Sequence, residues 1–420
     1  MTGKQRLGAV AAMGLALGAA AQVRATTGYQ LLGIGQYQMG MAGAVVAAPG
    51  DPMTAISNPA GLAWLQPQAA FSMEGFFPER EANFGSGTIG SHSNVYGVPA
   101  LGWLAPAFGP HLYFGGGFYG TSGMGVNYQQ SNYLGVGQSL EGYSDISFAN
   151  IAPALAWKGG KHWSLGVAVN VAYETASFQQ TVQTTTSPST IYGLNLANST
   201  SAFGLGATVG GLYELNRYIT LGLTYRSPII FTPLTWQASH QDLSMQGGPT
   251  GGPGQYSAHL NYPEQVAWGV AWHPTARWTV SLEGQWINWH ETMNHFNIYG
   301  PWNGTTHVTL PMHWHDEWVA NLGLQYAVNK WLTVRGGYAY GSNPIGSQDL
   351  ASNLILPAIM QHQVTVGATE QLGMGWTLTE AYMHAFQQSL SGTMPMGGGS
   401  VPIRTTMNED EIGVQIGYNF

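Results

Sequence analysis

Two histidines in this sequence have a spacing that could bind a metal ion. His313 and His315 are separated by one residue, so on a strand both imidazoles would lie on one face and form a possible metal pair. A histidine-rich loop at the level of the lipid headgroups is the simpler interpretation of residues 307–315. His290 also lacks the second histidine, four residues further on, of a helical zinc motif. We therefore predict no metal site and no cofactor.

Nucleophilic catalysis is the second chemistry to consider, because a lipase needs a serine within reach of a histidine. A barrel-shaped lipase would carry this pair on its outer wall, and His384 is the histidine whose segment fits best. No sequence feature marks a serine as the nucleophile. We therefore predict no catalytic residues and no enzyme activity, and a lipase assay on the purified protein would test the alternative.

Arg226 and Arg335 are candidates for binding the carboxylate of a ligand. Both fall on the face of their segments that carries small and polar residues, which in a barrel faces the lumen. Glu174 and Glu283 fall on the same face. Two interpretations follow: either these glutamates form structural ion pairs with the arginines, or the arginines contact the headgroup of a ligand.

The segments that position these residues alternate large apolar with small or polar side chains, a pattern typical of β-strands. The alternation is clearest in residues 163–173, 203–213, 219–226, 318–326 and 411–420. Short connections alternate with long polar ones along the chain. The short connections are 108–111, 158–161, 214–217, 273–277, 328–330 and 372–375, and the long ones are 78–97, 121–144, 180–201, 232–256, 290–315, 341–354 and 389–408.

This order of connections favours an all-β fold, a 14-stranded antiparallel transmembrane β-barrel over residues 68–420, with short periplasmic turns and long external loops. The strand pattern alone would also fit a secreted soluble β-protein, in which the large residues point inward. Two features favour lipid outside. Tryptophans follow the short turns at one common depth, as in an aromatic girdle: Trp163, Trp278, Trp331 and Trp376. Basic residues lie in the same turns, outside the hydrocarbon: Lys158, Lys161, Arg217, Arg277 and Lys330.

Composition excludes two other classes of protein, a bundle of membrane-spanning helices and a fold held by disulfides. The chain has 59 glycines, 15 tryptophans and 21 tyrosines but only 8% charged residues. No apolar run after the N-terminus approaches the roughly 20 residues of a membrane-spanning helix. The absence of cysteine excludes a disulfide framework.

The N-terminus has the features of an export signal. Residues 1–25 combine two basic residues with an apolar run, Leu7 to Ala21, and small residues at the end, so we predict a signal peptide; a short buried helix is the alternative. Without this segment the chain loses Lys4, Arg6 and Arg24, keeping nine basic and 20 acidic residues, a formal charge of −11. Nucleic acid is therefore a poor partner.

Residues 26–67 do not alternate and are rich in glycine, alanine and methionine. This segment is too polar to span a membrane and too apolar to hang free in the periplasm. We predict that it forms an N-terminal plug, or hatch, inside the lumen of the barrel; a disordered tail is the alternative.

Several short segments resemble the FadL/TodX family of outer-membrane transporters. In the hatch these are residues 28–31, 40–44 and 58–62, and the triplet Asn58-Pro59-Ala60 is the most specific. Weaker similarities follow at residues 99–102, 152–156, 225–228 and 262–264. The terminal Tyr418-Asn419-Phe420 is similar to the aromatic assembly signal of outer-membrane barrels in general.

The resemblance implies uptake of long-chain fatty acids or related hydrophobic compounds across the outer membrane of a Gram-negative bacterium. The ligand would cross a plugged barrel by passive diffusion and leave sideways beside the third strand. Gly115, Gly116 and Gly117 interrupt that strand, and we expect them to kink it. The alternative is that they merely face a crowded hatch. Asn58 is expected to hold the hatch to the wall, so its replacement by alanine should change uptake and leave barrel assembly intact.

Other functions and partners stay open at this stage. Uncharged aromatic or alkane hydrocarbons are alternative ligands, which the scarcity of lumenal cations favours. A porin or adhesin is less well supported, because a porin needs an open lumen with a charged constriction. The expected partners are a hydrophobic small molecule, outer-membrane lipid with lipopolysaccharide, and the barrel assembly machinery, and we expect a monomer.

Overall fold

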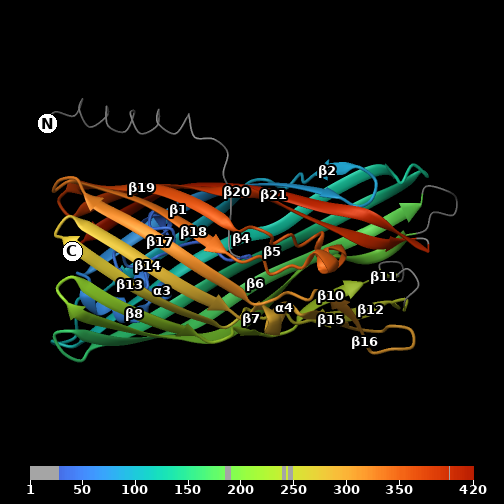
Figure 1. The fold of residues 1–420 in the computed structure, drawn as a ribbon. Coiled ribbons are helices and arrows are strands. Elements are labelled where there is room, and N and C mark those ends of the chain that lie inside the picture. Colours follow the sequence, from blue (N-terminus) through green and yellow to red (C-terminus); the bar gives the residue numbers. More distant parts are fainter. Residues whose placement is uncertain (1–27, 185–190, 239–242, 245–248, 397) are drawn as a thin grey trace.

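The computed structural model describes residues 28–184, 191–238, 243–244, 249–396 and 398–420 (Figure 1). The predicted signal peptide, residues 1–25, and the first two residues of the predicted hatch lie outside the described residues. Among the described residues, no helix has the length and the apolar composition needed to cross a membrane.

Fourteen long antiparallel strands form a closed ring, as the sequence predicts. Each strand pairs with the next along the chain, and all 16 residues of the first strand pair with the last one, which closes the barrel. The wall strands are β1 (Gln68–Asn83), β3 (Tyr96–Leu104), β4 (Leu112–Tyr133), β5 (Gln138–Lys158), β6 (Trp163–Thr184), β7 (Ile191–Asn216), β8 (Ile219–Arg226), β13 (Gln265–Thr275), β14 (Trp278–Ile287), β17 (Glu317–Ala327), β18 (Leu332–Gly341), β19 (His362–Gly373), β20 (Trp376–Met396) and β21 (Gly399–Asn419).

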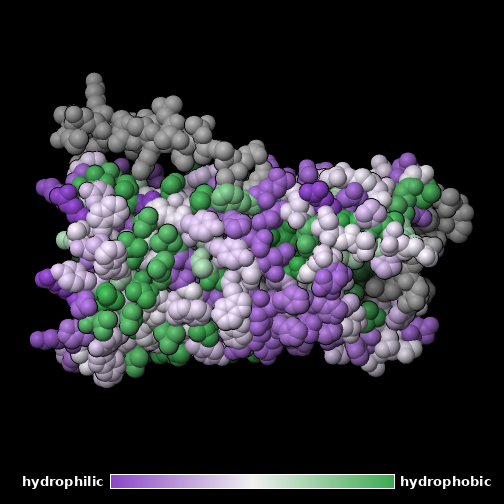
Figure 2. Space-filling model, in the orientation of Figure 1, coloured by the Kyte–Doolittle hydropathy of each residue, from purple (hydrophilic) through white to green (hydrophobic). Residues whose placement is uncertain are grey.

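The two faces of the wall follow the alternation of the sequence. In β6, Val167, Val169 and Val171 are exposed on the outside, whereas Ala168 and Asn170 between them are buried in the lumen. Apolar residues gather over the half of the barrel that carries the short turns, on the left of Figure 2. This belt of large apolar side chains on the outer face is what a lipid environment requires.

Several predicted long loops are instead continuations of the strands. Residues 121–144 and 389–408 form most of the outer halves of two hairpins, β4 with β5 and β20 with β21. Polar residues on the outer faces of these extensions, such as Gln129, Glu141 and Ser389, hid them from the periodicity, because strands outside the membrane need no apolar outer face.

A small second sheet of four strands lies among the outer loops, on the lower right of Figure 1. It comprises β10 (Leu234–Ala238), β12 (Gly254–Ala258), β15 (His295–Tyr299) and β16 (His307–Pro311). The remaining short elements at this end are β2 (Thr88–Gly90), β9 (Ile230–Phe231), β11 (Leu243–Ser244), α4 (Trp289–Met293), η3 (Ser347–Asp349) and α5 (Leu350–Asn353).

Residues 28–67 fill the lumen of the ring. They form α2 (Gln36–Gly40), α3 (Thr54–Ser57) and η2 (Pro59–Trp64), joined by irregular chain. Nearly every residue of this segment is buried, and its backbone N–H groups and side chains bond to lumen-facing residues of the wall. We refer to residues 28–67 as the hatch.

The predicted kink at Gly115–Gly117 is wrong. Residues 115–117 pair in register with β3 on one side and with β5 on the other, without a break. The glycines make room instead. A Cβ at Gly117 would lie 2.4 Å from the Ile56 side chain of the hatch, and a Cβ at Gly116 would lie 2.3 Å from the ring of Trp103. Gly115 and Gly117 fit the alternative, in which the glycines face a crowded hatch, and Gly116 does not.

Candidate functional site

A large apolar cavity lies at the outer end of the lumen. Its volume is about 670 Å³, within the usual range for small-molecule sites. The wall strands, the outer loops and α5 contribute side chains such as Phe178, Leu260, Met293, Met312 and Ile355. Gln138 and Gln180 are among the few polar residues in the lining, and none of the described residues that line it is charged. The cavity is therefore suited to an apolar ligand.

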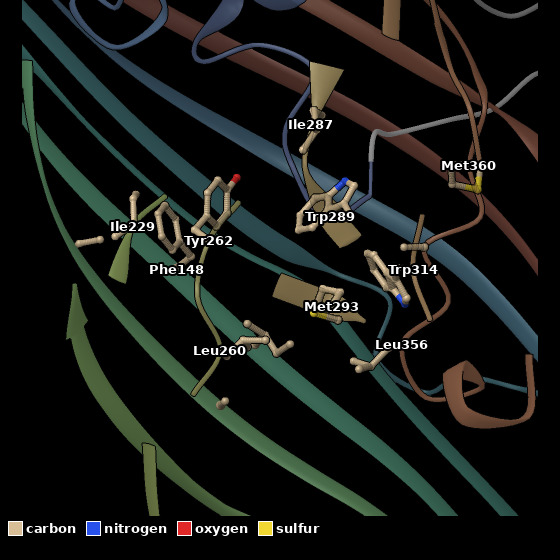
Figure 3. Close-up of a cluster of buried hydrophobic side chains, with 14 of the residues drawn as sticks. Phe148, Ile229, Leu260, Tyr262, Ile287, Trp289, Met293, Trp314, Leu356 and Met360 are labelled. Carbon is tan, nitrogen blue, oxygen red and sulfur yellow. The ribbon is translucent and has the colours of Figure 1, made fainter. Parts of the chain in front are cut away.

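A cluster of buried aromatic rings lies next to Leu260 and Met293, two residues that line this cavity (Figure 3), and we refer to these rings as the floor. Phe148 stacks on Tyr262 with 4.7 Å between the ring centroids. Trp289 lies beyond Tyr262 and contacts Trp314 edge to face at 5.4 Å. Tyr29 of the hatch packs on Trp289 at 4.5 Å, so the hatch takes part in the floor.

Hydrogen bonds hold the two tryptophans of the floor in place. The indole of Trp289 donates to Glu317 at 2.9 Å, and that of Trp314 donates to Asn353 at 2.7 Å. Phe148 has no group that can form such a hydrogen bond, so its ring is held by packing alone. Phe148 is thus the ring of the floor that can move without loss of a polar contact, whereas Tyr262 also has a side-chain hydrogen bond with Tyr119.

A second, smaller cavity lies deeper in the lumen, between the hatch and the wall. Its volume is about 80 Å³, and Tyr119, Thr208, Arg226 and Tyr262 line it from the wall. The hatch contributes the opposite side, including Gln30. Tyr262 belongs to both the floor of the outer cavity and the lining of the inner one.

Asn58, in the triplet Asn58-Pro59-Ala60, fastens the hatch to the wall. Its side-chain amide donates to the carbonyl oxygens of Val46 at 2.7 Å and Gly211 at 3.3 Å, and its Oδ1 accepts from the N–H of Ala60 at 3.2 Å. That last bond caps η2, in which Pro59 occupies the first turn. A Cβ at Gly210 would lie 2.1 Å from Asn58 Oδ1, so only glycine leaves space for this contact.

Arg226 and Arg335 face the lumen, as predicted, but the ion pairs with Glu174 and Glu283, one of the two interpretations of the sequence, do not form. The ion pairs among the described residues all involve histidine. Arg226 donates to the carbonyl oxygen of Ile56 in the hatch at 3.2 Å. Arg335 lies 4.6 Å from the ring centroid of Tyr37. Both arginines thus bind the hatch.

Arg335 is further fixed to its own wall. Its guanidinium donates to Gln325 at 2.8 Å and to Thr369 at 2.7 Å. Glu283, in turn, accepts the backbone N–H groups of Val45 and Val46, each at 2.8 Å. The glutamate and the arginine therefore act separately as anchors for the hatch.

Buried carboxyl groups outnumber buried cations in the lumen. Seven acidic residues are buried: Asp51, Glu74, Glu174, Glu283, Glu317, Glu409 and Glu411. Arg80 is buried, whereas Arg226 and Arg335 are half-buried. In the hatch, burial raises the pKa of Asp51 to about 7, against the opposing effect of its hydrogen bond with Gln415.

The wall contains a seam without strand pairing between the outer parts of β3 and β4. The ladder between β3 and β4 ends at Ala100 and Tyr119, and the next main-chain link is the N–H of His92 donating to Asn127 at 2.9 Å. The register of β4 against β5 also shifts between Ser122 and Met124. The irregularity predicted for the third strand thus lies a few residues beyond Gly115–Gly117.

Comparison with known proteins identifies the fold and the family. The sequence model of the family "Outer membrane protein transport protein (OMPP1/FadL/TodX)" matches residues 12–420. The chain belongs to this family. It is therefore an outer-membrane β-barrel that transports hydrophobic compounds. The OMPP1/FadL/TodX family consists of transport channels and not of enzymes.

Individual members of the OMPP1/FadL/TodX family show the range of similarity. A "Long-chain fatty acid transport protein" of Escherichia coli is 22% identical over 359 residues, covering 76% of this chain and 78% of that protein. The crystal structure of the toluene transporter TodX of Pseudomonas putida matches with a TM-score of 0.72 at 17% identity, over 93% of this chain and 99% of TodX. A FadL homologue of Pseudomonas aeruginosa matches with a TM-score of 0.73 at 16% identity, over 94% of this chain and all of that one.

The histidines singled out by the sequence do not converge on a common site. His313 and His315 lie in the irregular connection between β16 and β17, and His313 contacts Asp349 at 2.8 Å. Within the described parts of the chain, no group of three metal-ligating residues is close enough to hold an ion. His384 contacts Asp410, which also accepts from Tyr382 at 2.6 Å, on the outer face of the barrel.

Tyr418 and Phe420 end the last strand among other aromatic rings. Tyr418 contacts Trp376 at 5.0 Å and Phe420 at 5.3 Å between centroids, and Phe420 is largely exposed. The exposed ring leaves the C-terminus accessible, as the predicted assembly signal requires; its recognition stays a prediction.

Sequence reasoning missed the residues that build the outer cavity and its floor. Trp289, Trp314 and Met293 come from outer connections that carry no periodic pattern. Their signal was a cluster of tryptophan and methionine in otherwise polar loops. Large apolar residues in such loops must find a buried partner, so they indicate a site formed by the loops themselves.

Proposed function

We propose that the protein takes up small uncharged hydrophobic molecules by passive diffusion, with the outer apolar cavity as the first binding site. The observation that carries this proposal is that, in the part of the chain that the structure describes, no charged side chain lines the 670 Å³ cavity. An apolar molecule leaving water gains free energy there in proportion to its buried surface, about 25 cal/mol per Å².

The balance of buried charge supports uncharged ligands over fatty-acid anions. Seven buried acidic residues stand against one buried and two half-buried arginines. A carboxylate entering this lumen finds no unengaged arginine among the described lumenal residues, since Arg226 and Arg335 hold the hatch. Long-chain fatty acids, which the family resemblance favours first, become the second candidate, supported by the 22% identical relative from Escherichia coli.

We further propose that ligands leave sideways through the seam between β3 and β4. Tyr119 lines the inner cavity and is also the last residue of β4 that pairs with β3. A molecule that passes the floor therefore arrives beside the unpaired segment. Lateral exit delivers an apolar ligand to the acyl chains and avoids a water-filled passage to the periplasm.

Two measurements test the proposal. Mass spectrometry of molecules that co-purify with the full-length protein should find uncharged hydrophobic compounds. In competition binding, a hydrocarbon should displace a bound hydrophobic probe better than the carboxylate of equal carbon number. Tighter binding of the carboxylate would overturn the preference for uncharged ligands and restore fatty acids as the leading candidate.

Ion conductance separates this proposal from an open porin. A barrel whose lumen is occupied by the hatch should conduct few ions across a planar bilayer. A large, steady conductance of the wild-type protein would contradict the plugged transport route.

A further inference from the structure

Glu174 is a buried acid with no identified task in the barrel. It lies on β6 and faces the lumen, between the buried Ala172 and Ala176. In register, it is level with Phe148 of β5 and with Ala202 of β7. Three of its nearest neighbours along and across the strands are thus alanines, which leave the carboxyl uncrowded.

The carboxyl of Glu174 differs from other buried carboxyls of the lumen in its lack of a partner. Glu283 accepts two backbone N–H groups, Glu317 accepts the indole of Trp289, and Glu74 accepts from Gln36 at 3.2 Å. Oε1 is also unpaired in Glu74 and Glu317, but the other carboxyl oxygen of each accepts a bond. Glu174, by contrast, has a buried Oε1 without a partner and accepts no side-chain or backbone hydrogen bond among the described residues. A buried polar atom left unpaired is costly, so its retention points to a partner that arrives with the ligand.

Glu174 also lies at the boundary between the two cavities. Phe178, two lumen-facing positions further along β6, lines the outer cavity. Phe148, level with Glu174, stacks on Tyr262, which lines the inner cavity. Burial raises the pKa of Tyr29 in the hatch, and the nearby Glu174 raises that pKa further. Because Tyr29 packs in the floor, Glu174 lies close to the floor as well. Glu174 therefore lies beside the floor, between residues that line the outer cavity and residues that pack on the inner one.

We infer that Glu174 accepts a hydrogen bond from the hydroxyl group of an apolar ligand, such as an alcohol or a phenol. The inference rests on the proposed function and narrows its ligand class. A carboxyl group offers an accepting oxygen in either ionisation state, and a hydroxyl group supplies the missing donor without bringing a charge into the lumen. A ligand carboxylate has no donor to offer, and a plain hydrocarbon has none either, so both would leave Oε1 unpaired.

The test compares toluene, benzyl alcohol and benzoate as ligands of the detergent-solubilised full-length chain. Tryptophan fluorescence reports binding, because Trp289 and Trp314 lie in the floor. For the E174L variant we expect benzyl alcohol to bind about tenfold more weakly, equal to 1.4 kcal/mol, and toluene to change less than about twofold. The E174Q variant keeps an accepting oxygen and should lose only about threefold or less for benzyl alcohol.

A matched control comes from Glu380 on the same barrel. Glu380 belongs to β20 and is exposed on the outer face, so the E380L variant removes a carboxyl without touching the lumen. It should leave all three affinities unchanged. Equal changes for toluene and benzyl alcohol in E174L would overturn the role of Glu174. If no hydrophobic ligand binds to the wild-type protein, the proposed function itself fails, which is a separate outcome.

Discussion

Replacement of Asn58 by alanine tests how the hatch is held in the barrel. The change removes two hydrogen bonds from the side-chain amide and the cap on the N–H of Ala60. The bond to Gly211 joins the hatch to the wall, and the other two hold the hatch in the shape that docks. Each contributes about 1 kcal/mol, so the docked, folded hatch should lose about 3 kcal/mol relative to a hatch that is both undocked and unfolded. That loss corresponds to a roughly 100-fold rise in the population of the undocked, unfolded hatch.

Hydrogen exchange with mass spectrometry measures this population directly. Amides of the hatch should exchange faster in the N58A variant, whereas amides of β1 and β21 should keep their protection, because those strands pair along all 16 residues of β1. The N150A variant is the control, since Asn150 is equally buried but bonds to Asn170 in the wall. Hatch protection equal to that of the wild type in N58A would refute the reasoning.

Three further predictions concern the hatch and the floor. The G117V variant should displace the hatch, because its Cβ would lie 2.4 Å from the Ile56 side chain, and should raise ion conductance; G97V, where a Cβ meets nothing within 4 Å, should not. Asp51 has a pKa of about 7 when docked and about 3.9 when solvated, so docking should be strongest below about pH 4 and weaken up to about pH 7. Hydrogen exchange, corrected for intrinsic rates, should show this weakening in the wild type and lose it in D51N. The F148A variant removes the ring stacked on Tyr262 and should speed uptake of bulky hydrophobic ligands; an unchanged or slower uptake rate would contradict its place in the floor.

Much of the fold followed from the sequence because a lipid-facing wall imposes a strict pattern. Segments such as 163–173 must alternate, and the tryptophans after the short turns mark one edge of the membrane. The start of the barrel at Gln68 coincides with the start of β1. These features are local, and a single chain is enough to reveal them.

The site was harder to predict because it depends on contacts between distant residues. The effect of Gly115–Gly117 could not be read from the strand alone, since the space they leave is occupied by hatch residues more than fifty positions earlier. The ion-pair interpretation of Arg226 and Arg335 was wrong for the same reason. Both arginines bind the hatch, and not the glutamates that the alternation places on the same face. The seam lies where two strands separate, which the pattern of neither strand records.

The seam between β3 and β4 also has a consequence for chemical control of the protein. Elsewhere in its membrane-spanning part the ring offers few free edges, since each wall strand has a neighbour on both sides. Above Ala100 and Tyr119, however, two stretches of backbone face one another without pairing. A short extended peptide could add there as an extra strand by main-chain hydrogen bonds, and its side chains would supply the selectivity. Such a compound would block the barrel from the side and would not compete with its cargo.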